Sequence, residues 1–309
     1  MPNTLAHIGV QGLATQILIR DADPKWIYVG CIIPDLPWIL QRFIRVAFSG
    51  IDLYDVRLYA VVQSSLFFSL ILSVALAALS THLWRVFSIL ALNSLLHLLF
   101  DPFQLKWANG VHLFAPISWE MTNFGFFWPE SLPTYLLTGL GLIYFLWNWR
   151  RGITIPVDIN LRSATRLFIP TTLIIIYFVV PFFLLDGPER ADNHFVRTLQ
   201  NTDDRAGKYI EIDRDSYSHS PSGDSLQTFA GEELEVEGMA LEHSATVSVR
   251  GTFVTDDKIH VHEYHVHYAF RDIASYVGLT LIAIIWIVAL LRQKFGKRLP
   301  PPITFRSNE

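Results

Sequence analysis

Five segments of this 309-residue chain contain no Asp, Glu, Lys or Arg, and this absence of charge restricts the fold more than any other feature. A helix needs about 20 apolar residues to cross the hydrocarbon core of a membrane, with a range of about 17–25. Four segments are that long, and the fifth becomes so only when Arg85 and Asp101 at its ends are included. The sequence therefore predicts an α-helical integral membrane domain with four to five spans. The five segments are 58–84, 86–100, 131–149, 167–185 and 273–291.

The charged residues are unevenly divided along the chain. Residues 187–272 contain 17 acidic and 8 basic side chains, a net charge of −9, and the remainder contains 11 acidic and 16 basic side chains, a net charge of +5. The acidic, soluble-looking stretch would repel phosphates, so we expect no nucleic-acid partner. The single cysteine, Cys31, excludes an intrachain disulfide and a Cys-rich zinc site.

Basic residues beside the apolar segments indicate which side of the membrane each flank occupies, because short cytoplasmic flanks are rich in Lys and Arg. Two basic flanks, one between the third and fourth segments and one after the last, are expected in the cytoplasm. The acidic insert and the segment 101–130 are then outside it. The side on which the N-terminus starts stays open. The basic residues of the two flanks are Arg150, Arg151, Arg162, Arg166, Arg292, Lys294, Lys297 and Arg298.

The first 56 residues contain two apolar stretches, 5–19 and 26–40, which Gly, Pro, Asp and His interrupt. This pattern predicts short, partly buried or re-entrant helices. No Lys or Arg precedes Arg20, so we expect no cleavable signal peptide. The predicted organisation is a helical membrane domain over 1–185, an extracytoplasmic β domain over 186–272, a C-terminal transmembrane helix over 273–292 and a cytoplasmic tail over 293–309.

Short runs from Lys208 onward alternate between apolar and polar residues and are separated by turn-forming residues. A period of two predicts antiparallel strands, here in a small five-stranded barrel or sandwich. The expected barrel has an OB-like shape, which assigns no ligand. The five runs are KYIEIDR, SLQTFAG, ELEVEG, ATVSVRGTFV and KIHVHEYHVH.

The last of these runs carries a candidate second metal site. His260 and His262 share one face of the strand, and His265 and His267 share the other, because side chains alternate. Each pair has a spacing that suits Zn²⁺ or Cu²⁺. The alternative is a polar strand face just above the membrane that binds no metal.

The most informative polar residues lie within an apolar segment. Asn93, His97 and Asp101 are spaced by four, so on a helix they form one polar stripe. A carboxylate near hydrocarbon costs about 2.5–3.5 kcal/mol on insertion scales, which makes such a residue a functional candidate. His97 and Asp101 can also share one metal ion, as ligands four apart do in H-E-x-x-H helices. The alternative is a stripe that packs helices together by hydrogen bonds.

Two further polar residues, His7 and Asp35, lie in the interrupted N-terminal stretches. Together with His97 and Asp101 they supply two imidazoles and two carboxylates. This ligand set suits a divalent cation, Zn²⁺ first and Mn²⁺ or Fe²⁺ as alternatives, and the activation of a bound water. We expect all four residues to bind the ion and Asp35, His97 and Asp101 to be catalytic, with Asn93 as an additional neighbour.

The order of these motifs resembles the YdjM-like family of inner-membrane metal-dependent hydrolases, described as LexA-regulated in bacteria. The matching motifs span roughly residues 1–120, about two fifths of the chain. The resemblance implies a hydrolase of the bacterial inner membrane, distantly related to zinc-dependent phospholipase C and its nuclease relatives, with the same four residues as metal ligands. The motifs are TLAHIGVQG with His7, GCIIPDLPW with Asp35, HLLFDPFQ with His97 and Asp101, and GVHLFAPISW from Gly110 to Trp119.

The sequence departs from the family pattern at two places. The family continues Pro-Asp with a second Asp and a His, but Asp35 is followed by Leu-Pro-Trp. The family also has a Thr-His-Ser-Leu motif at the start of the next span, where residues 63–65 are Gln-Ser-Ser. The site therefore holds a single ion, recruits His112 or Glu120 from the following loop, or is inactive. Glu130, further along the loop, is expected only to begin the next helix.

Two functions are consistent with these features. The first is a membrane-bound metal-dependent hydrolase that acts on an ester or phosphoester of a lipid-like or envelope substrate through a metal-activated water. The second is a non-catalytic membrane protein with a degenerate metal site, whose outer β domain binds a ligand or protein partner that the sequence does not identify.

Overall fold

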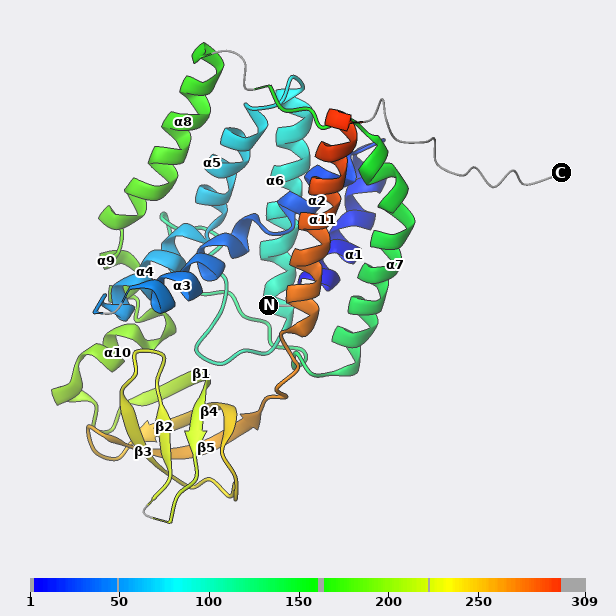
Figure 1. The fold of residues 1–309 in the computed structure, drawn as a ribbon. Coiled ribbons are helices and arrows are strands. Elements are labelled where there is room, and N and C mark those ends of the chain that lie inside the picture. The colour runs from blue at the N-terminus through cyan, green and yellow to red at the C-terminus, as the bar shows by residue number, and fades with distance from the viewer. Residues whose placement is uncertain (1–2, 49, 161–163, 222, 296–309) are drawn as a thin grey trace.

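The computed structural model describes residues 3–48, 50–160, 164–221 and 223–295. The expected basic residues Arg162, Lys297 and Arg298, and the expected tail from residue 296 onward, lie outside the described residues. The molecule consists of a helical part and a smaller β-barrel at one end of it (Figure 1).

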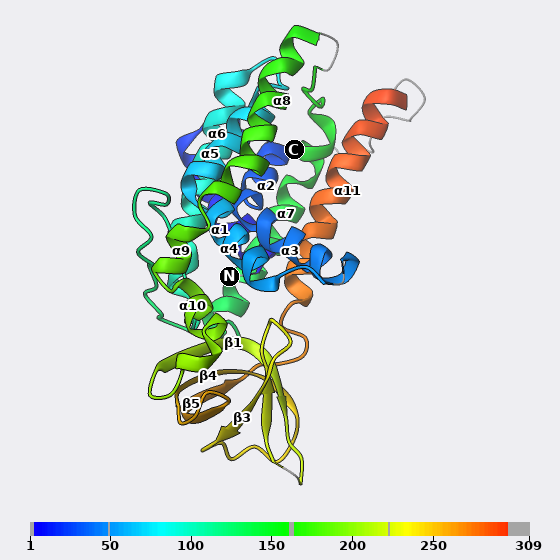
Figure 2. The ribbon, with the colours of Figure 1, turned by 90° about the vertical axis from the view of Figure 1, so that its left-hand side faces the viewer.

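The helical part combines long helices with short ones that lie near the barrel. In Figures 1 and 2, α9 and α10 lie between the long helices and the barrel, and α11 returns from the barrel into the helical part. The helices are α1 (Thr4–Leu18), α2 (Pro24–Gly30), α3 (Leu36–Ala47), α4 (Leu53–Gln63), α5 (Leu66–Ala77), α6 (Leu83–Phe100), α7 (Leu132–Thr154), α8 (Ala164–Val179), α9 (Asp186–Arg190), α10 (Val196–Gln200) and α11 (Ile273–Phe295).

Four helical stretches among the described residues are long and apolar enough to cross a membrane, and α4 with α5 would make a fifth. This number agrees with the predicted four to five apolar helices, but their identity differs in part. The stretch Pro24–Ala47 is one of the four, although its sequence predicted short interrupted helices. The predicted segment 131–149 does form α7. Its Gly, Pro, Thr, Tyr and Asn residues lower its mean hydropathy, so α7 is not one of the four apolar stretches. The other three are Leu83–Phe103, Leu167–Arg190 and Ile273–Phe295.

The uninterrupted span predicted for 58–84 is wrong. Helix α4 ends at Gln63 and α5 begins at Leu66, with a bend of 70° between them. Ser64 donates its hydroxyl hydrogen to the Val61 carbonyl over 3.1 Å, and Ser65 has the extended backbone of an N-cap residue. Serine hydroxyls compete with the backbone for such hydrogen bonds, so a Ser-Ser pair interrupts a helix that apolar composition alone would continue.

Glycine allows α1 to pack against α7 at very short range. A Cβ added to Gly141 on α7 would overlap the backbone carbonyl of Leu5 on α1, and a Cβ added to Gly9 would lie 2.7 Å from the Gly141 nitrogen. Small residues at helix contacts let two backbones approach closely. The short distance matters to the site described below, because α1 carries His7.

We expect Gly141→Ala to destabilise the protein and Gly139→Ala, its matched control, not to. Within a helix, Gly→Ala by itself stabilises by roughly 0.5–1 kcal/mol. At Gly141 the new methyl group must push α1 away, and overpacking of this kind costs about 1–3 kcal/mol. A Cβ at Gly139 meets nothing within 4 Å. Thermal unfolding of the detergent-solubilised variants measures the difference, and equal midpoints for the two would contradict the close packing.

The five predicted strands are all present, and they form a closed barrel rather than a sandwich. The order around the barrel is β1-β2-β3-β5-β4. One expectation is wrong: β3 and β5 pair in parallel, with Val236 opposite Ile259, whereas the other pairs are antiparallel. The strands are β1 (Tyr209–Ser218), β2 (Ser225–Gln227), β3 (Glu233–Glu237), β4 (Ala245–Phe253) and β5 (Lys258–Val266).

The barrel interior is filled by the apolar residues of the alternating runs. Ile210, Leu226, Leu234, Val249 and Ile259 are fully buried, one from each strand. Residues 186–204, at the start of the expected β domain, instead form α9, α10 and short helical turns. The barrel itself therefore begins at β1.

Candidate metal centre and the adjoining cavity

The four residues predicted as metal ligands meet at one place in the helical part. His7 lies on α1, Asp35 on the turn before α3, His97 near the end of α6 and Asp101 directly after it. The His7 Nε2 atom is 3.1 Å from Asp101 Oδ1, and the His97 Nε2 atom is 3.4 Å from Asp35 Oδ1 and 3.7 Å from Asp101 Oδ2. Both histidines have no exposed surface. Segments far apart in the sequence thus converge on a buried cluster of imidazoles and carboxylates.

Local sequence explains how each side chain reaches the cluster. The side chain of Asn3 accepts a hydrogen bond from the Ala6 nitrogen and begins α1 one turn before His7. The spacing of four places His97 and Asp101 above one another, and Pro102 helps to end the regular helix there. Pro34 similarly tightens the turn that holds Asp35.

The atoms that face the centre of the cluster have no hydrogen-bond partner among the described residues. They are His7 Nε2, His97 Nε2, Asp35 Oδ1 and Asp101 Oδ1. Buried polar atoms are normally paired, because leaving one unpaired costs about 1–3 kcal/mol and more for a charged group. One cation between them would provide an electrostatic partner for all four atoms.

The hydrogen bond on the other side of the His97 ring defines its tautomer. His97 Nδ1 lies 2.7 Å from the carbonyl oxygen of Cys31. A carbonyl oxygen only accepts, so Nδ1 donates its hydrogen and the neutral ring keeps its lone pair on Nε2. That lone pair faces two carboxylates, an arrangement that a cation stabilises. Histidine ligands usually donate their second nitrogen to a carbonyl or carboxylate in this way.

The ring of His7 also has a hydrogen-bond partner, but in the opposite sense. The side-chain nitrogen of Gln11, one turn further along α1, lies 2.6 Å from His7 Nδ1 and can only donate, so the neutral ring carries its hydrogen on Nε2. A metal ion at Nε2 would need that hydrogen moved to Nδ1 and the Gln11 amide turned so that its oxygen accepts it. The ring also stacks on that of His97, with centroids 3.9 Å apart and planes 4° from parallel. Both Nε2 atoms therefore point to the same side, toward Asp101.

Three of the four residues form the tightest group. Ligand atoms of His7, His97 and Asp101 all lie within 4.8 Å of one another, and Asp35 lies at the edge of this group. Two imidazoles and one carboxylate with an open position match both catalytic zinc sites and the facial triad of non-haem iron. The residues present can hold one divalent cation.

The additional candidates do not join this group. Asn93 donates to the Thr15 hydroxyl over 2.9 Å and to the Ile89 carbonyl over 2.7 Å. Its amide therefore links α6 to α1, which agrees with the alternative that the polar stripe packs helices together. His112 is buried, where burial lowers its pKa to about 4, and its Nδ1 lies 3.3 Å from the amide of Asn193. Glu120 is exposed on the loop.

Gln63, in the segment where the resemblance noted in the sequence would place a histidine, has a structural role. Gln63 is buried at the end of α4 and donates to the carbonyl of Tyr177 over 3.0 Å, which ties α4 to α8. Its amide nitrogen is also 3.2 Å from the Tyr59 hydroxyl.

The four strand histidines lie as two separate pairs, on the two faces that the alternation predicted. His260 contacts Glu237 over 3.1 Å, and His262 contacts the Thr252 hydroxyl over 2.9 Å. A register shift between Arg250 and Gly251 lies beside this part of β5. The two pairs of histidines therefore face different surroundings.

His265 and His267 meet Glu130, which the sequence assigned only to the start of a helix. Glu130 lies 3.2 Å from His265 Nε2, 2.8 Å from His267 Nδ1 and 3.4 Å from Arg271 Nε. His267 Nε2 also contacts the Ser248 hydroxyl over 2.8 Å. Burial opposes ionisation of Glu130, but the two histidines and Arg271 lower its pKa below the usual range. This group could hold a metal ion, yet its hydrogen bonds and ion pair already satisfy it, so it acts as a clamp between the barrel and the loop before α7.

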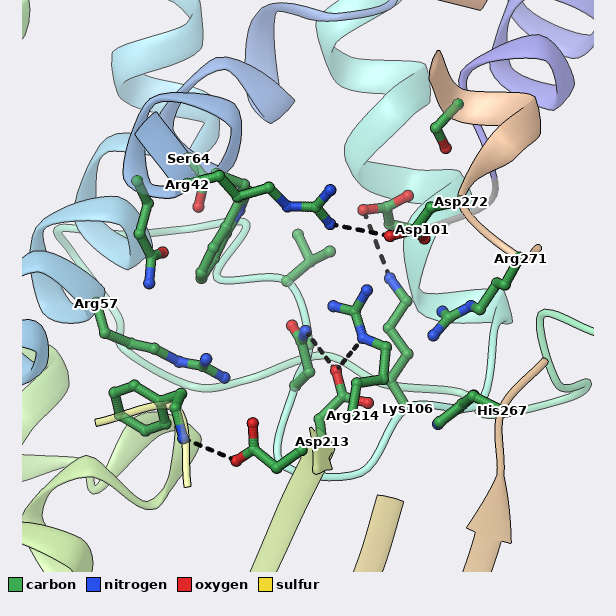
Figure 3. A pocket seen from close by; sticks show the side chains of 18 of the residues that line it. Arg42, Arg57, Ser64, Asp101, Lys106, Asp213, Arg214, His267, Arg271 and Asp272 are labelled. Atoms are coloured by element: carbon green, nitrogen blue, oxygen red, sulfur yellow. Dashed lines mark hydrogen bonds and ion pairs between the residues drawn. The ribbon is translucent and has the colours of Figure 1, made fainter. Parts of the chain in front are cut away.

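A cavity of about 370 Å³ adjoins the first centre and extends to the barrel. Its walls include His97 and Asp101 from the centre, α3 and α4, the loop after α6, β1 and the segment that joins β5 to α11. Figure 3 shows basic side chains that enter this space from several elements. The sequence pattern did not identify them, because they are scattered along the chain. The basic residues of the wall are Arg42, Arg45, Arg57, Lys106, Arg214 and Arg271.

Four carboxylates also line the cavity, and most of them already have partners within the protein. Asp213 accepts from the Ser248 hydroxyl over 2.9 Å and pairs with Arg214 over 3.1 Å. Burial opposes its ionisation, but Arg214 and Arg271 lower its pKa below the usual range. Burial raises the pKa of Asp215 to about 7, which leaves that group partly protonated at neutral pH. Asp272 is near Arg42, and Asp101 faces His7.

Comparisons with protein-family models, with curated proteins and with solved structures return no match for this chain.

Proposed function

We propose that this protein is a membrane-embedded, metal-dependent hydrolase. The observation that carries the proposal is the convergence of four buried ligand atoms from α1, α6 and two turns beside a cavity, where they contact one another but make no hydrogen bond among the described residues. The order of the four motifs, which resembles the YdjM-like family, supports the same assignment. The substrate would be an ester or phosphoester of a lipid-like or envelope molecule.

The chain's own residues would hold and orient the centre. His7, His97 and Asp101 would be the ligands, with Cys31 and Gln11 fixing the two rings through their Nδ1 atoms. A bound divalent cation would lower the pKa of a water toward 7 and polarise the substrate oxygen. Asp35, 3.4 Å from His97 Nε2, is placed to complete the ligand set or to hold the proton of that water. Asp101 would join the centre to the cavity, because it belongs to both.

The helical part would place this site close to a membrane surface. Helix α3 exposes Phe43 and Val46 on one side and carries Arg42 and Arg45 on the cavity wall. Such an amphipathic helix suits the boundary between headgroups and acyl chains. We place the protein in the bacterial inner membrane with the barrel outside the cytoplasm, as the basic flanks indicate. The OB-like barrel would then close the outer end of the cavity.

Metal removal tests the activity directly. Protein purified in detergent and treated with a chelator is expected to hydrolyse 4-nitrophenyl butyrate or bis(4-nitrophenyl) phosphate at least about 100-fold more slowly, because lost electrostatic stabilisation costs about 10²–10³ in rate. One equivalent of Zn²⁺, Mn²⁺ or Fe²⁺ should restore the rate. His265→Ala, which alters the satisfied group, should keep full activity. Hydrolysis that is absent before and after metal addition, or unchanged by the chelator, would oppose the proposal.

A further inference from the structure

The cavity beside the candidate metal centre is lined by several basic side chains. The inference drawn from them rests on the proposed function. His97 and Asp101 form part of the cavity wall, so the cavity borders the cluster of imidazoles and carboxylates. Its volume of about 370 Å³ is within the range of about 300–1,000 Å³ typical of small-molecule sites. The groups that a bound molecule would meet are mainly cationic.

Three of these cations have donors that the protein leaves unused. The Arg271 side chain is 10% exposed and its Nη1 atom has no hydrogen-bond partner among the described residues. The Nε atom of Arg57 has none either. Lys106 is 6% exposed, and its Nζ atom is 3.9 Å from the nearest carboxylate oxygen of Asp101, beyond hydrogen-bond distance. Buried cationic donors are costly unless an anion pairs with them.

The nearby carboxylates meet these cations only in part, because Glu130 contacts Arg271 through Nε, 3.4 Å away, and Asp101 is 3.9 Å from Lys106 Nζ. Asp213 is occupied by Arg214, Ser248 and Asn109, and Asp215 accepts from the Phe229 nitrogen over 2.9 Å. In Figure 3 the side chains of Arg57, Lys106, Arg214 and Arg271 approach the same space from different sides. A compact anion with several oxygen atoms would meet donors on more than one side here.

We propose that the cavity binds the phosphate group of the substrate, with Lys106, Arg271 and Arg57 as its principal donors. Arg and Lys bind phosphate through charge-assisted hydrogen bonds, and guanidinium groups match its oxygen geometry. A phosphate held there lies beside His97 and Asp101, which places a phosphoester bond at the metal centre. The substrate class is therefore a phosphoester, carried by a membrane lipid or by a soluble phosphate compound. The exposed apolar side of α3 next to Arg42 and Arg45 favours the lipid.

Calorimetric titration of the full chain in detergent, with the metal chelated, tests the proposal separately from catalysis. The probes are dihexanoyl phosphatidic acid, dihexanoyl glycerol as its matched partner without phosphate, and inorganic phosphate. The variants are Lys106→Met and Arg271→Gln, with Arg190→Gln as the control for loss of one exposed positive charge, since Arg190 pairs only with Asp186 among the described residues. Each cavity variant is expected to bind the phosphate-bearing probe at least about 10-fold more weakly, as a charged hydrogen bond contributes about 1.5–3 kcal/mol.

The outcomes separate the two sources of phosphate and the two proposals. Tighter binding of phosphatidic acid than of inorganic phosphate, with no binding of dihexanoyl glycerol, supports a lipid substrate, and equal binding of the two phosphates supports a soluble one. His7→Ala, which removes a ligand outside the cavity wall, should bind both as the wild type does. Phosphate binding in a protein that holds no metal would preserve this inference while overturning the hydrolase. Absence of phosphate binding, or binding that neither cavity variant weakens while both keep the wild-type melting temperature, would overturn it.

Discussion

His97→Ala is expected to reduce the affinity of the protein for a divalent cation by more than about 100-fold. Loss of a residue that merely orients a ligand typically costs 10–100-fold, and we propose His97 as a ligand itself. Its Nε2 atom lies within 3.7 Å of both carboxylates. Metal content per chain after gel filtration, measured by mass spectrometry, should fall from one equivalent to near zero.

Two matched variants make this result specific. Gln11→Leu removes only the contact to His7 Nδ1 and should weaken metal binding by about 10–100-fold without abolishing it. His265→Ala alters the other His/Glu group and should leave one equivalent of metal in place, because that group's hydrogen bonds are already satisfied. Retention of metal by His97→Ala, or its loss in His265→Ala, would show that the ion is bound elsewhere.

Glu232→Ala is expected to lower the free energy of unfolding of the barrel by about 3 kcal/mol. Arg205 is 1% exposed, and its guanidinium donates to the two oxygens of Glu232 over 2.6 and 2.7 Å. It also contacts the carbonyls of Leu199 and Asp256. Removing one partner of a buried pair leaves a buried charge without its counter-ion, at a cost of about 3–5 kcal/mol, and the partial exposure of Glu232 places it at the lower end.

The urea midpoint of the barrel, followed by proteolysis after brief exposure to urea, measures this loss. Glu237→Ala is the matched control, because Glu237 pairs with Lys258 and His260 on the exposed surface of the same barrel. Exposed pairs contribute little, so its midpoint should stay close to that of the wild type. A similar midpoint for both variants would contradict a structural role of the Arg205–Glu232 pair.

The sequence pointed to the four side chains that converge because each was anomalous in its own segment. A carboxylate such as Asp101 has no reason to lie at the end of an apolar helix unless it has a polar partner, and the spacing to His97 defines a shared face. Asp35 and His7 were anomalous for the same reason. The barrel was predicted equally well, because alternation of apolar residues is a local signal, and the parallel pairing of β3 with β5 depends on topology that no local signal carries.

Other features depend on contacts between distant segments, and no local sequence pattern predicts them. Glu130 is 135 positions from His265, and the sequence shows only an acidic residue before a helix. The cations of the cavity come from α3, α4, a loop, β1 and the segment between β5 and α11, so their convergence follows from the fold alone. Ser64 and Ser65 carried a weak signal for the bend, which the apolar composition around them outweighed.

The most direct test of the central claim is the X-ray absorption spectrum of the purified wild-type protein loaded with one equivalent of Zn²⁺. We expect a first shell of two imidazole nitrogens and one or two carboxylate oxygens at about 2.0–2.2 Å, with no sulfur contribution, and loss of the imidazole scattering in a His7→Ala and His97→Ala double variant. Failure to bind one equivalent of metal, or a shell in which no imidazole is detected, would contradict the claim that His7, His97 and Asp101 form a metal centre.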